Sequence, residues 1–199
     1  MRHRISRIGF GMIAGSALFL MTAGLQEGWA ENVFTLYRSD HAQLPVSFEY
    51  PAEWQVEYSS GTEEAYAQVQ MYGPASLDTR LRTYMVVRAV PPKAQGGRYA
   101  GVGEMVAAYQ TTLLPGLRVE QDRQIIVLDS PATMLDVSGM LNLPWEVSRA
   151  PRPVPVKSQR VFLEKDGWLY ELSWLTTPEA AQQVERAFSH LLNTLVLSR

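Results

Sequence analysis

The arrangement of apolar and polar residues along the chain predicts mainly β-structure. Over much of its length the two kinds of residue alternate, which is the period of a strand with one buried and one exposed face. The run at 83–90 is instead rich in β-branched residues, which is typical of an interior strand. The pattern predicts strands at 33–37, 45–50, 54–60, 65–73, 83–90, 117–129 and 132–141.

The clearest local signal lies at 159–175. Two β-rich runs there flank Asp166-Gly167. Asp-Gly is a preferred two-residue hairpin turn, because both positions of the turn need positive φ angles. The segment therefore predicts an antiparallel hairpin.

Two segments have a helical period. The first, at 103–114, ends before Pro115-Gly116. The second begins at Thr177-Pro178, where a threonine can cap the helix and a proline suits its first turn. Its apolar positions form one face that should close over a sheet: Ala180, Ala181, Val184, Ala187, Phe188, Leu191, Leu192 and Leu195. The order of strands, helix, strands and helix predicts an α+β domain, with an antiparallel β-sheet flanked by helices.

Residues 1–30 have the order of a secretory signal peptide. Three arginines precede an uncharged run at 8–25, and Gly28 and Ala30 occupy positions −3 and −1 of a small-x-small cleavage site. We expect cleavage to leave residues 31–199 as the domain. The alternative is an uncleaved membrane anchor, because the run is close to the shortest span of a bilayer. Both alternatives place the domain in the periplasm or otherwise outside the cytoplasm.

Composition and charge exclude several classes of function. The 199 residues contain no cysteine, which removes disulfides, iron–sulfur clusters, thiol catalysis and a lipid-modified N-terminal cysteine. The net charge is −2, and without residues 1–30 the domain has 15 basic and 19 acidic residues, a net charge of −4. A nucleic-acid partner is not expected, because such proteins need clustered lysine and arginine.

The segment 141–158 differs in composition from the rest of the chain. It holds four prolines, three basic residues and one tryptophan. Because proline cannot donate to a β-ladder, we expect a proline-rich loop. An exposed tryptophan among arginines is typical of a binding hot spot, although Trp145 could instead fold back over the sheet. The predicted partner-binding residues are Trp145, Arg149, Arg152 and Lys157.

We predict no catalytic residue, no metal site and no cofactor. The two histidines after the leader, His41 and His190, have no ligand spacing such as HxH or HExxH. The acidic pair Glu63-Glu64 lies in a polar turn, where solvation is the simpler interpretation. The glycine-rich stretch at 96–103 precedes a helix and could hold an anion there, but it lacks the GxGxxG and GK[ST] patterns. We expect a flexible linker.

Several motifs in this order resemble the Mog1/PsbP-like fold family. They are an FxYPxxW element, a Ser-Pro-Ala turn, a strand–Asp-Gly–strand pair and a closing helix, at 48–54, 130–132, 160–170 and 178–195. The resemblance covers roughly 45–197 and is with bacterial exported PsbP-like proteins. The proline-rich segment departs from the plant pattern, and the basic extension that docks PsbP on the photosystem has no counterpart.

The resemblance implies a docking platform rather than an enzyme. The nuclear member of the family binds a small GTPase, and the photosynthetic members help photosystem II to retain calcium and chloride. We therefore expect an exported, non-catalytic accessory module that docks on an envelope or membrane-associated protein. The alternative is a periplasmic carrier of a metal or small ligand, which would need a pocket between helix and sheet with converging polar groups.

Overall fold

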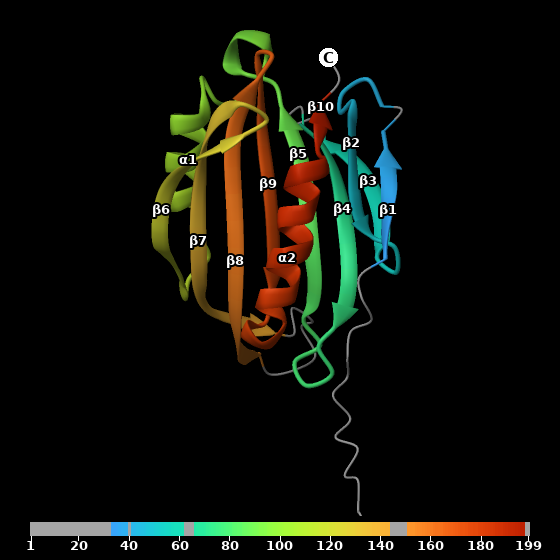
Figure 1. Ribbon diagram of the computed structural model, residues 1–199. Helices are drawn as coiled ribbons and strands as arrows, with labels where there is room; N and C mark the ends of the chain where they lie inside the picture. Colours follow the sequence, from blue (N-terminus) through green and yellow to red (C-terminus); the bar gives the residue numbers. More distant parts are fainter. Residues whose placement is uncertain (1–32, 40, 62–65, 144–150, 198–199) are drawn as a thin grey trace, which may run out of the picture. The chain divides into compact units, whose positions relative to one another are not determined.

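The computed structural model describes residues 33–39, 41–61, 66–143 and 151–197. These residues form two antiparallel β-sheets (Figure 1). A three-stranded sheet contains, in spatial order, β1 (Phe34–Arg38), β2 (Val46–Pro51) and β10 (Val196–Leu197). A long sheet contains, in spatial order, β3 (Gln55–Gly61), β4 (Tyr66–Ala75), β5 (Arg82–Val90), β9 (Trp168–Thr176), β8 (Arg152–Lys165), β7 (Ser130–Leu143) and β6 (Leu117–Val127).

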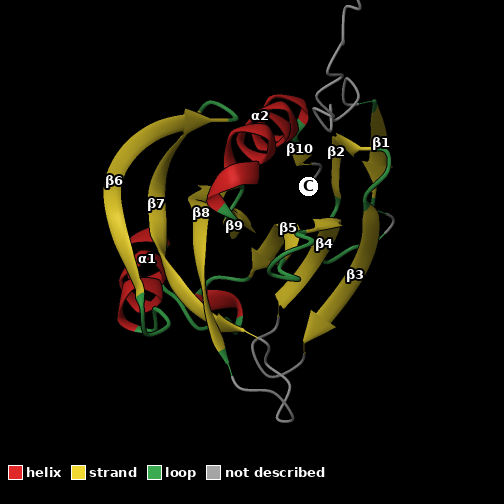
Figure 2. Ribbon diagram, turned by 90° about the horizontal axis from the view of Figure 1, so that it is seen from below, coloured by secondary structure: helices red, strands yellow, loops and turns green. Residues whose placement is uncertain are grey.

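The helices lie on opposite sides of the long sheet. Helix α2 (Pro178–Thr194) and the three-stranded sheet cover one side, which we call the α2 face (Figure 2). Helix α1 (Val102–Thr111) packs on the other side, the α1 face, over the end formed by β6, β7 and β8. Among the described residues, neither helix is long and apolar enough to cross a membrane.

The main hydrophobic core fills the α2 face. Alternate residues of β4, β5, β8 and β9 point into it, and α2 contributes Val184, Phe188 and Leu191. Trp54 and Trp174 belong to this core and are 6% and 4% exposed, while Trp168 packs against it and is partly buried. Burying each large apolar side chain is worth about 1.5–3 kcal/mol, so this face supplies most of the stability of the fold.

The strongest local predictions are confirmed. Strands β8 and β9 form the expected hairpin, and Asp166 and Gly167 have φ angles of 51° and 75°, as the turn requires. Helix α2 begins at Pro178 and closes over the sheet as expected. Thr177 occupies the N-cap position, but its side chain makes no capping hydrogen bond.

The antiparallel sheet was predicted, but its division into two was not. Strands β1 and β2 pair with each other and with β10 after α2, and they do not join the long sheet. The alternating pattern predicts that a segment is a strand. It does not predict which strand pairs with it, because that depends on residues far away in the sequence. Helix α2 therefore shares its face with a second sheet.

The predicted flexible linker at 96–103 is wrong, because this stretch has a defined structure. The 3-10 helix η1 (Lys93–Gln95) precedes it, and Pro92 bridges to Tyr99. A Cβ atom at Gly97 would lie 1.6 Å from the carbonyl oxygen of Pro91. Glycine is needed there for a close approach of two backbone segments, rather than for flexibility.

The predicted loop at 141–158 is wrong over most of its described part. Strand β7 continues to Leu143 and β8 begins at Arg152, while residues 144–150 lie outside the described residues. The register of β8 with β9 begins only at Lys157, so the prolines at 153 and 155 belong to a stretch paired with β7 alone. Proline is tolerated there, because one side of the strand has no ladder partner.

Candidate ligand-binding pocket

The register of the three central strands builds the floor of the α1 face. Arg88 on β5 lies opposite Glu171 on β9, and Arg160 on β8 lies opposite Ser173. Tyr84 lies opposite Leu175 in the same way. Because side chains alternate along a strand, these residues all point to the α1 face, whereas their neighbours in sequence point into the core of the α2 face.

A cavity of about 1460 Å³ lies on this face. It is larger than the roughly 300–1,000 Å³ of ordinary small-molecule sites. Strands β5, β7, β8 and β9 contribute to its floor, and α1 and the turn between β4 and β5 contribute to its walls. Helix α1 has ten residues, of which only Met105 is fully buried, so it covers only part of the sheet.

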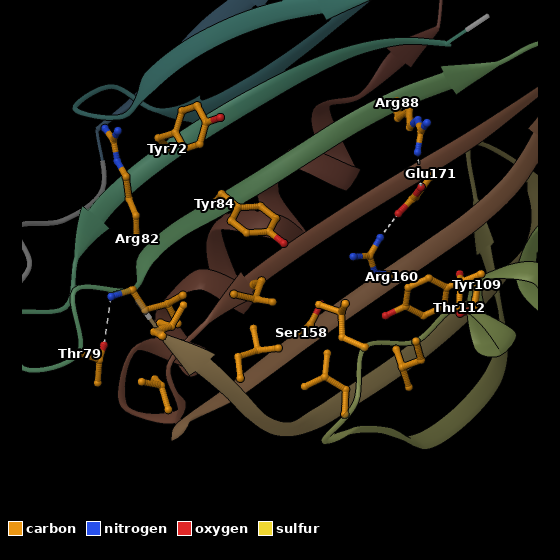
Figure 3. A pocket seen from close by; sticks show the side chains of 18 of the residues that line it. Tyr72, Thr79, Arg82, Tyr84, Arg88, Tyr109, Thr112, Ser158, Arg160 and Glu171 are labelled. Carbon is orange, nitrogen blue, oxygen red and sulfur yellow. Dashed lines mark hydrogen bonds and ion pairs between the residues drawn. The ribbon is translucent and has the colours of Figure 1, made fainter. Parts of the chain in front are cut away.

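Three charged side chains form what we call the polar centre of the cavity: Arg88, Arg160 and Glu171 (Figure 3). Arg160 Nη1 donates to Glu171 Oε1, and Arg88 Nη1 lies 3.7 Å from Glu171 Oε2. The side chains of Arg160 and Glu171 are 20% and 9% exposed. One carboxylate thus contacts two guanidinium groups, and the Arg160–Glu171 pair lies in partly desolvated surroundings.

Aromatic rings surround the polar centre. The guanidinium carbons of Arg160 and Arg88 lie 4.4 Å and 4.3 Å from the ring centroids of Tyr109 and Tyr66. Such cation–π contacts stabilise a cation that has lost part of its water. The hydroxyl of Tyr84 points toward Arg160 (Figure 3). Arg160 Nε is buried and has no hydrogen-bond partner among the described residues.

The protonation states of this group follow from burial and charge. Burial raises the pKa of Tyr84 and of Tyr109, and the positive charge of Arg160 offsets this only in part. Burial opposes the charged form of Arg160, but the Glu171 carboxylate, Tyr109 and Tyr84 together outweigh it and raise the pKa of the guanidinium above its ordinary value. At neutral pH both phenols keep their protons, and Arg160 is charged.

The opposite part of the cavity is apolar. We call it the apolar end, formed by buried side chains of β7, β8, β9 and the turn before β5: Leu81, Leu141, Leu143, Val154 and Leu175. Two further leucines of the lining, Leu77 and Leu114, are 87% and 47% exposed. The cavity therefore combines a charged centre, an apolar end and apolar side chains open to solvent.

The lining as a whole is strongly basic. It holds six arginines, namely Arg80, Arg82, Arg88, Arg98, Arg152 and Arg160, against Asp78 and Glu171. This gives a formal excess of four positive charges in a domain whose net charge is −4. The positive charge of the domain is thus concentrated at the cavity, where it favours an anionic ligand.

The four residues predicted from sequence fall in different places. Arg152 is exposed and lines the cavity. Lys157 is exposed on β8 and is not part of the lining. Trp145 and Arg149 lie outside the described residues. Glu63-Glu64 also lies outside them.

The two histidines lie apart. His190 Nε2 lies 2.7 Å from Glu49 Oε2, and the ring of His190 stacks on Phe34. His41 stacks on Tyr58. Among the described residues no group of three or more His, Cys, Asp or Glu side chains is placed to hold a metal ion.

Sequence reasoning missed the polar centre, although a signal was present. Arg88 and Glu171 each interrupt an apolar strand, and Arg160 directly precedes an apolar run. A charged residue within such a strand must either be buried or break the alternation, and buried charges need partners. The pairing of the three could not be predicted, because it depends on strand order.

Comparisons with known proteins identify the fold. No protein-family model matches the sequence, and no curated protein matches it either. A protein of unknown function from Pseudomonas aeruginosa, PA94, is 22% identical with a TM-score of 0.50, over 83% of this chain and 98% of that one. Cyanobacterial PsbP from Synechocystis sp. PCC 6803 is 11% identical with a TM-score of 0.52, over 86% of this chain and 96% of that one.

A third solved structure is more distant. LpqN, which is involved in cell envelope biogenesis of Mycobacterium tuberculosis, is 10% identical with a TM-score of 0.49, over 84% of this chain and 91% of that one. At such identities the similarities concern the fold and not the ligand. The domain has the Mog1/PsbP-like fold that its sequence motifs indicated.

Proposed function

We propose that this protein is an exported, non-catalytic binding module of the cell envelope that holds an amphipathic organic ligand in the cavity on its α1 face. The observation that carries the proposal is the cavity itself, in which a charged centre and an apolar end share one space of about 1460 Å³. A pocket with a few convergent polar groups is the usual form of a small-molecule site.

Export is supported by the sequence. The basic, apolar and small-residue regions of residues 1–30 follow the order of a signal peptide. The expected location is the periplasm or another extracytoplasmic compartment.

The chemistry of the lining supports binding rather than catalysis. The Ser158 hydroxyl donates to the carbonyl oxygen of Trp174 at 2.6 Å, so it is held by the backbone and not by a base. The Thr112 hydroxyl likewise donates to the carbonyl oxygen of Ala108, at 2.9 Å. Arginine cannot act as a general base, and Glu171 is held by two arginines. These groups can orient a ligand, but they form no nucleophile–base pair.

Dye binding tests the proposal with a matched pair of variants. N-phenyl-1-naphthylamine is a neutral dye that fluoresces in apolar surroundings, and we expect it to bind the domain at saturable sites. Thr112→Trp narrows the cavity and should weaken the binding, whereas Thr111→Trp should not. Thr111 is the last residue of α1 and Thr112 is its C-cap; both are exposed and bond back to the helix, but only Thr112 lines the cavity. Equal effects of the two variants, or no saturable binding, would contradict the proposal.

Docking on an envelope protein is a second candidate, favoured by one observation. Arg152, a predicted contact residue, is exposed on the cavity lining, so a partner could cover the same opening. A photo-crosslinking residue at position 152, tested in intact cells, should then capture a defined envelope protein, and one at exposed position 186 on α2 should not. Capture at both positions, or at neither, would count against docking through this opening.

A further inference from the structure

The α1 face of strand β8 changes in polarity along its length. Arg160, Ser158 and Val154 point to this face in turn, and the strand passes from the polar centre to the apolar end. A strand rises about 3.3 Å per residue, so Arg160 and Val154 are separated by about 20 Å. The cavity is therefore elongated from a charged part to an apolar part. A rounded or uniformly polar ligand would match only one of them.

The charge of the lining favours an anion beside Arg160. Even without Arg88 and Arg98, the lining holds four arginines, Arg80, Arg82, Arg152 and Arg160, against Asp78 and Glu171. The side chain of Arg160 is 20% exposed, so part of its guanidinium group is open to a ligand. An excess of positive charge around a partly desolvated site favours an added anion. Arg160 and the hydroxyl of Tyr84, which points toward it, supply donors for such an anion (Figure 3).

Resting on the proposed function, we infer that the ligand is a single-chain anionic amphiphile. Its carboxylate or phosphate headgroup binds beside Arg160, and its acyl chain lies along β8 against the apolar end. An uncharged lipid would fill the apolar end but would gain nothing from the positive charge of the lining. A cationic amphiphile would be repelled by the six arginines of the lining.

The probes separate headgroup from chain. Dodecanoate, dodecyl phosphate, dodecan-1-ol and dodecyltrimethylammonium share one chain, and each is used below its micellar concentration to displace N-phenyl-1-naphthylamine. We expect the two anions to bind about ten-fold more tightly than the alcohol, which is the effect of one charge-assisted hydrogen bond. Acetate and inorganic phosphate, which have no chain, should bind much more weakly than the dodecyl anions.

Two variants should change this preference in opposite directions. Arg160→Gln removes the guanidinium group beside which the headgroup binds, so the preference for dodecanoate over dodecanol should fall about ten-fold. Glu171→Gln removes the competing carboxylate, so the preference should rise. Arg186→Gln, on the exposed surface of α2, is the matched control and should leave it unchanged. A variant that only damages the fold would weaken all probes together.

The outcomes distinguish this inference from the proposed function. If dodecanol binds as tightly as dodecanoate, or if both variants shift the preference in the same direction, the anionic class is wrong and the cavity remains a binding site. Binding of acetate or phosphate as tight as that of the dodecyl anions would overturn the requirement for a chain. If neither the dye nor any dodecyl probe binds, the proposed function fails as well.

Discussion

The two faces of the long sheet are built from alternate residues of the same strands, yet they differ in chemistry. On β8 and β9, Val161 and Leu172 point into the core of the α2 face, while Arg160 and Glu171, one position away, point to the α1 face. Helix α2 and the three-stranded sheet fill the first face with apolar side chains. The α1 face instead holds buried charge and an open cavity.

This difference separates stability from binding. Apolar burial stabilises a fold without regard to direction, whereas a buried ion pair is weak evidence for stability because desolvation offsets its attraction. The Arg88–Glu171–Arg160 group is therefore better explained by recognition than by folding. We expect changes on the α2 face to lower the free energy of unfolding, and changes on the α1 face to alter ligand affinity as well.

The largest expected effect is on the α2 face. Phe188 is 1% exposed in the main core, so Phe188→Ala should lower the free energy of unfolding by about 3–5 kcal/mol. Urea denaturation of the purified domain measures this loss. A loss below about 1 kcal/mol, which is typical of surface substitutions, would show that this face is not the main source of stability.

Breaking the polar centre should lower the free energy of unfolding by less than Phe188→Ala does. Apolar replacements of the whole group should avoid most of this loss. Glu171→Ala removes the carboxylate that pairs with the partly buried Arg160 and should lower the free energy of unfolding by about 3 kcal/mol. The triple replacement Arg88→Met, Glu171→Leu and Arg160→Met should restore most of it, because apolar residues of similar size remove the desolvation cost. Urea denaturation of both variants tests this. If the triple variant is as unstable as Glu171→Ala, the ion group stabilises the fold.

Alkaline pH should lower the stability of the domain through two tyrosines of the α1 face. The pKa of Tyr84 and of Tyr109 is raised above the ordinary value of 10.0, mainly by burial. Folding thus favours the protonated phenols, so their contribution is complete below pH 10.0 and is lost as the pH rises through the higher pKa of the folded state. Stability measured from pH 9 upward should fall, and Tyr84→Phe with Tyr109→Phe should reduce the fall. An unchanged profile would place the alkaline sensitivity elsewhere.

The smallest expected effects distinguish Arg152 from Lys157, which the sequence analysis predicted together as partner-binding residues. Arg152→Ala removes a charge from the cavity lining and should weaken dodecanoate binding by a few-fold, as an exposed charge contributes at most about 1 kcal/mol. Lys157→Ala, on the same strand but outside the lining, should leave it unchanged. Both changes should alter stability by less than about 0.5 kcal/mol. Equal losses of affinity would indicate a general charge effect rather than a site.

The comparison also shows what the sequence could and could not predict. The hairpin at Asp166-Gly167 and the apolar face of α2 were predictable, because each depends on residues close together in the chain. The extent of β8 was not predictable. Its prolines at 153 and 155 are tolerated because this part of the strand is paired on one side alone, and that depends on the order of the strands.

The polar centre of the α1 face was missed for a similar reason. Each charge of the polar centre was visible within or beside an apolar strand, but their meeting depends on the order β5–β9–β8. Local sequence gives the side of a strand on which a residue lies, whereas the neighbouring strand decides its partner. Sequence reasoning therefore identified the face that stabilises the fold and overlooked the face that is suited to bind a ligand.

The most direct test of the central claim is the position of a bound anion in the molecule. Titration of the ¹⁵N-labelled domain with dodecanoate can be followed through the Nε–Hε resonances of its arginines. We predict that Arg160 and Arg88 shift with the same saturation curve, while Arg186 on the α2 side and Arg118 on β6 do not move. Saturable binding that leaves Arg160 and Arg88 unchanged, or shifts confined to the other arginines, would contradict the account.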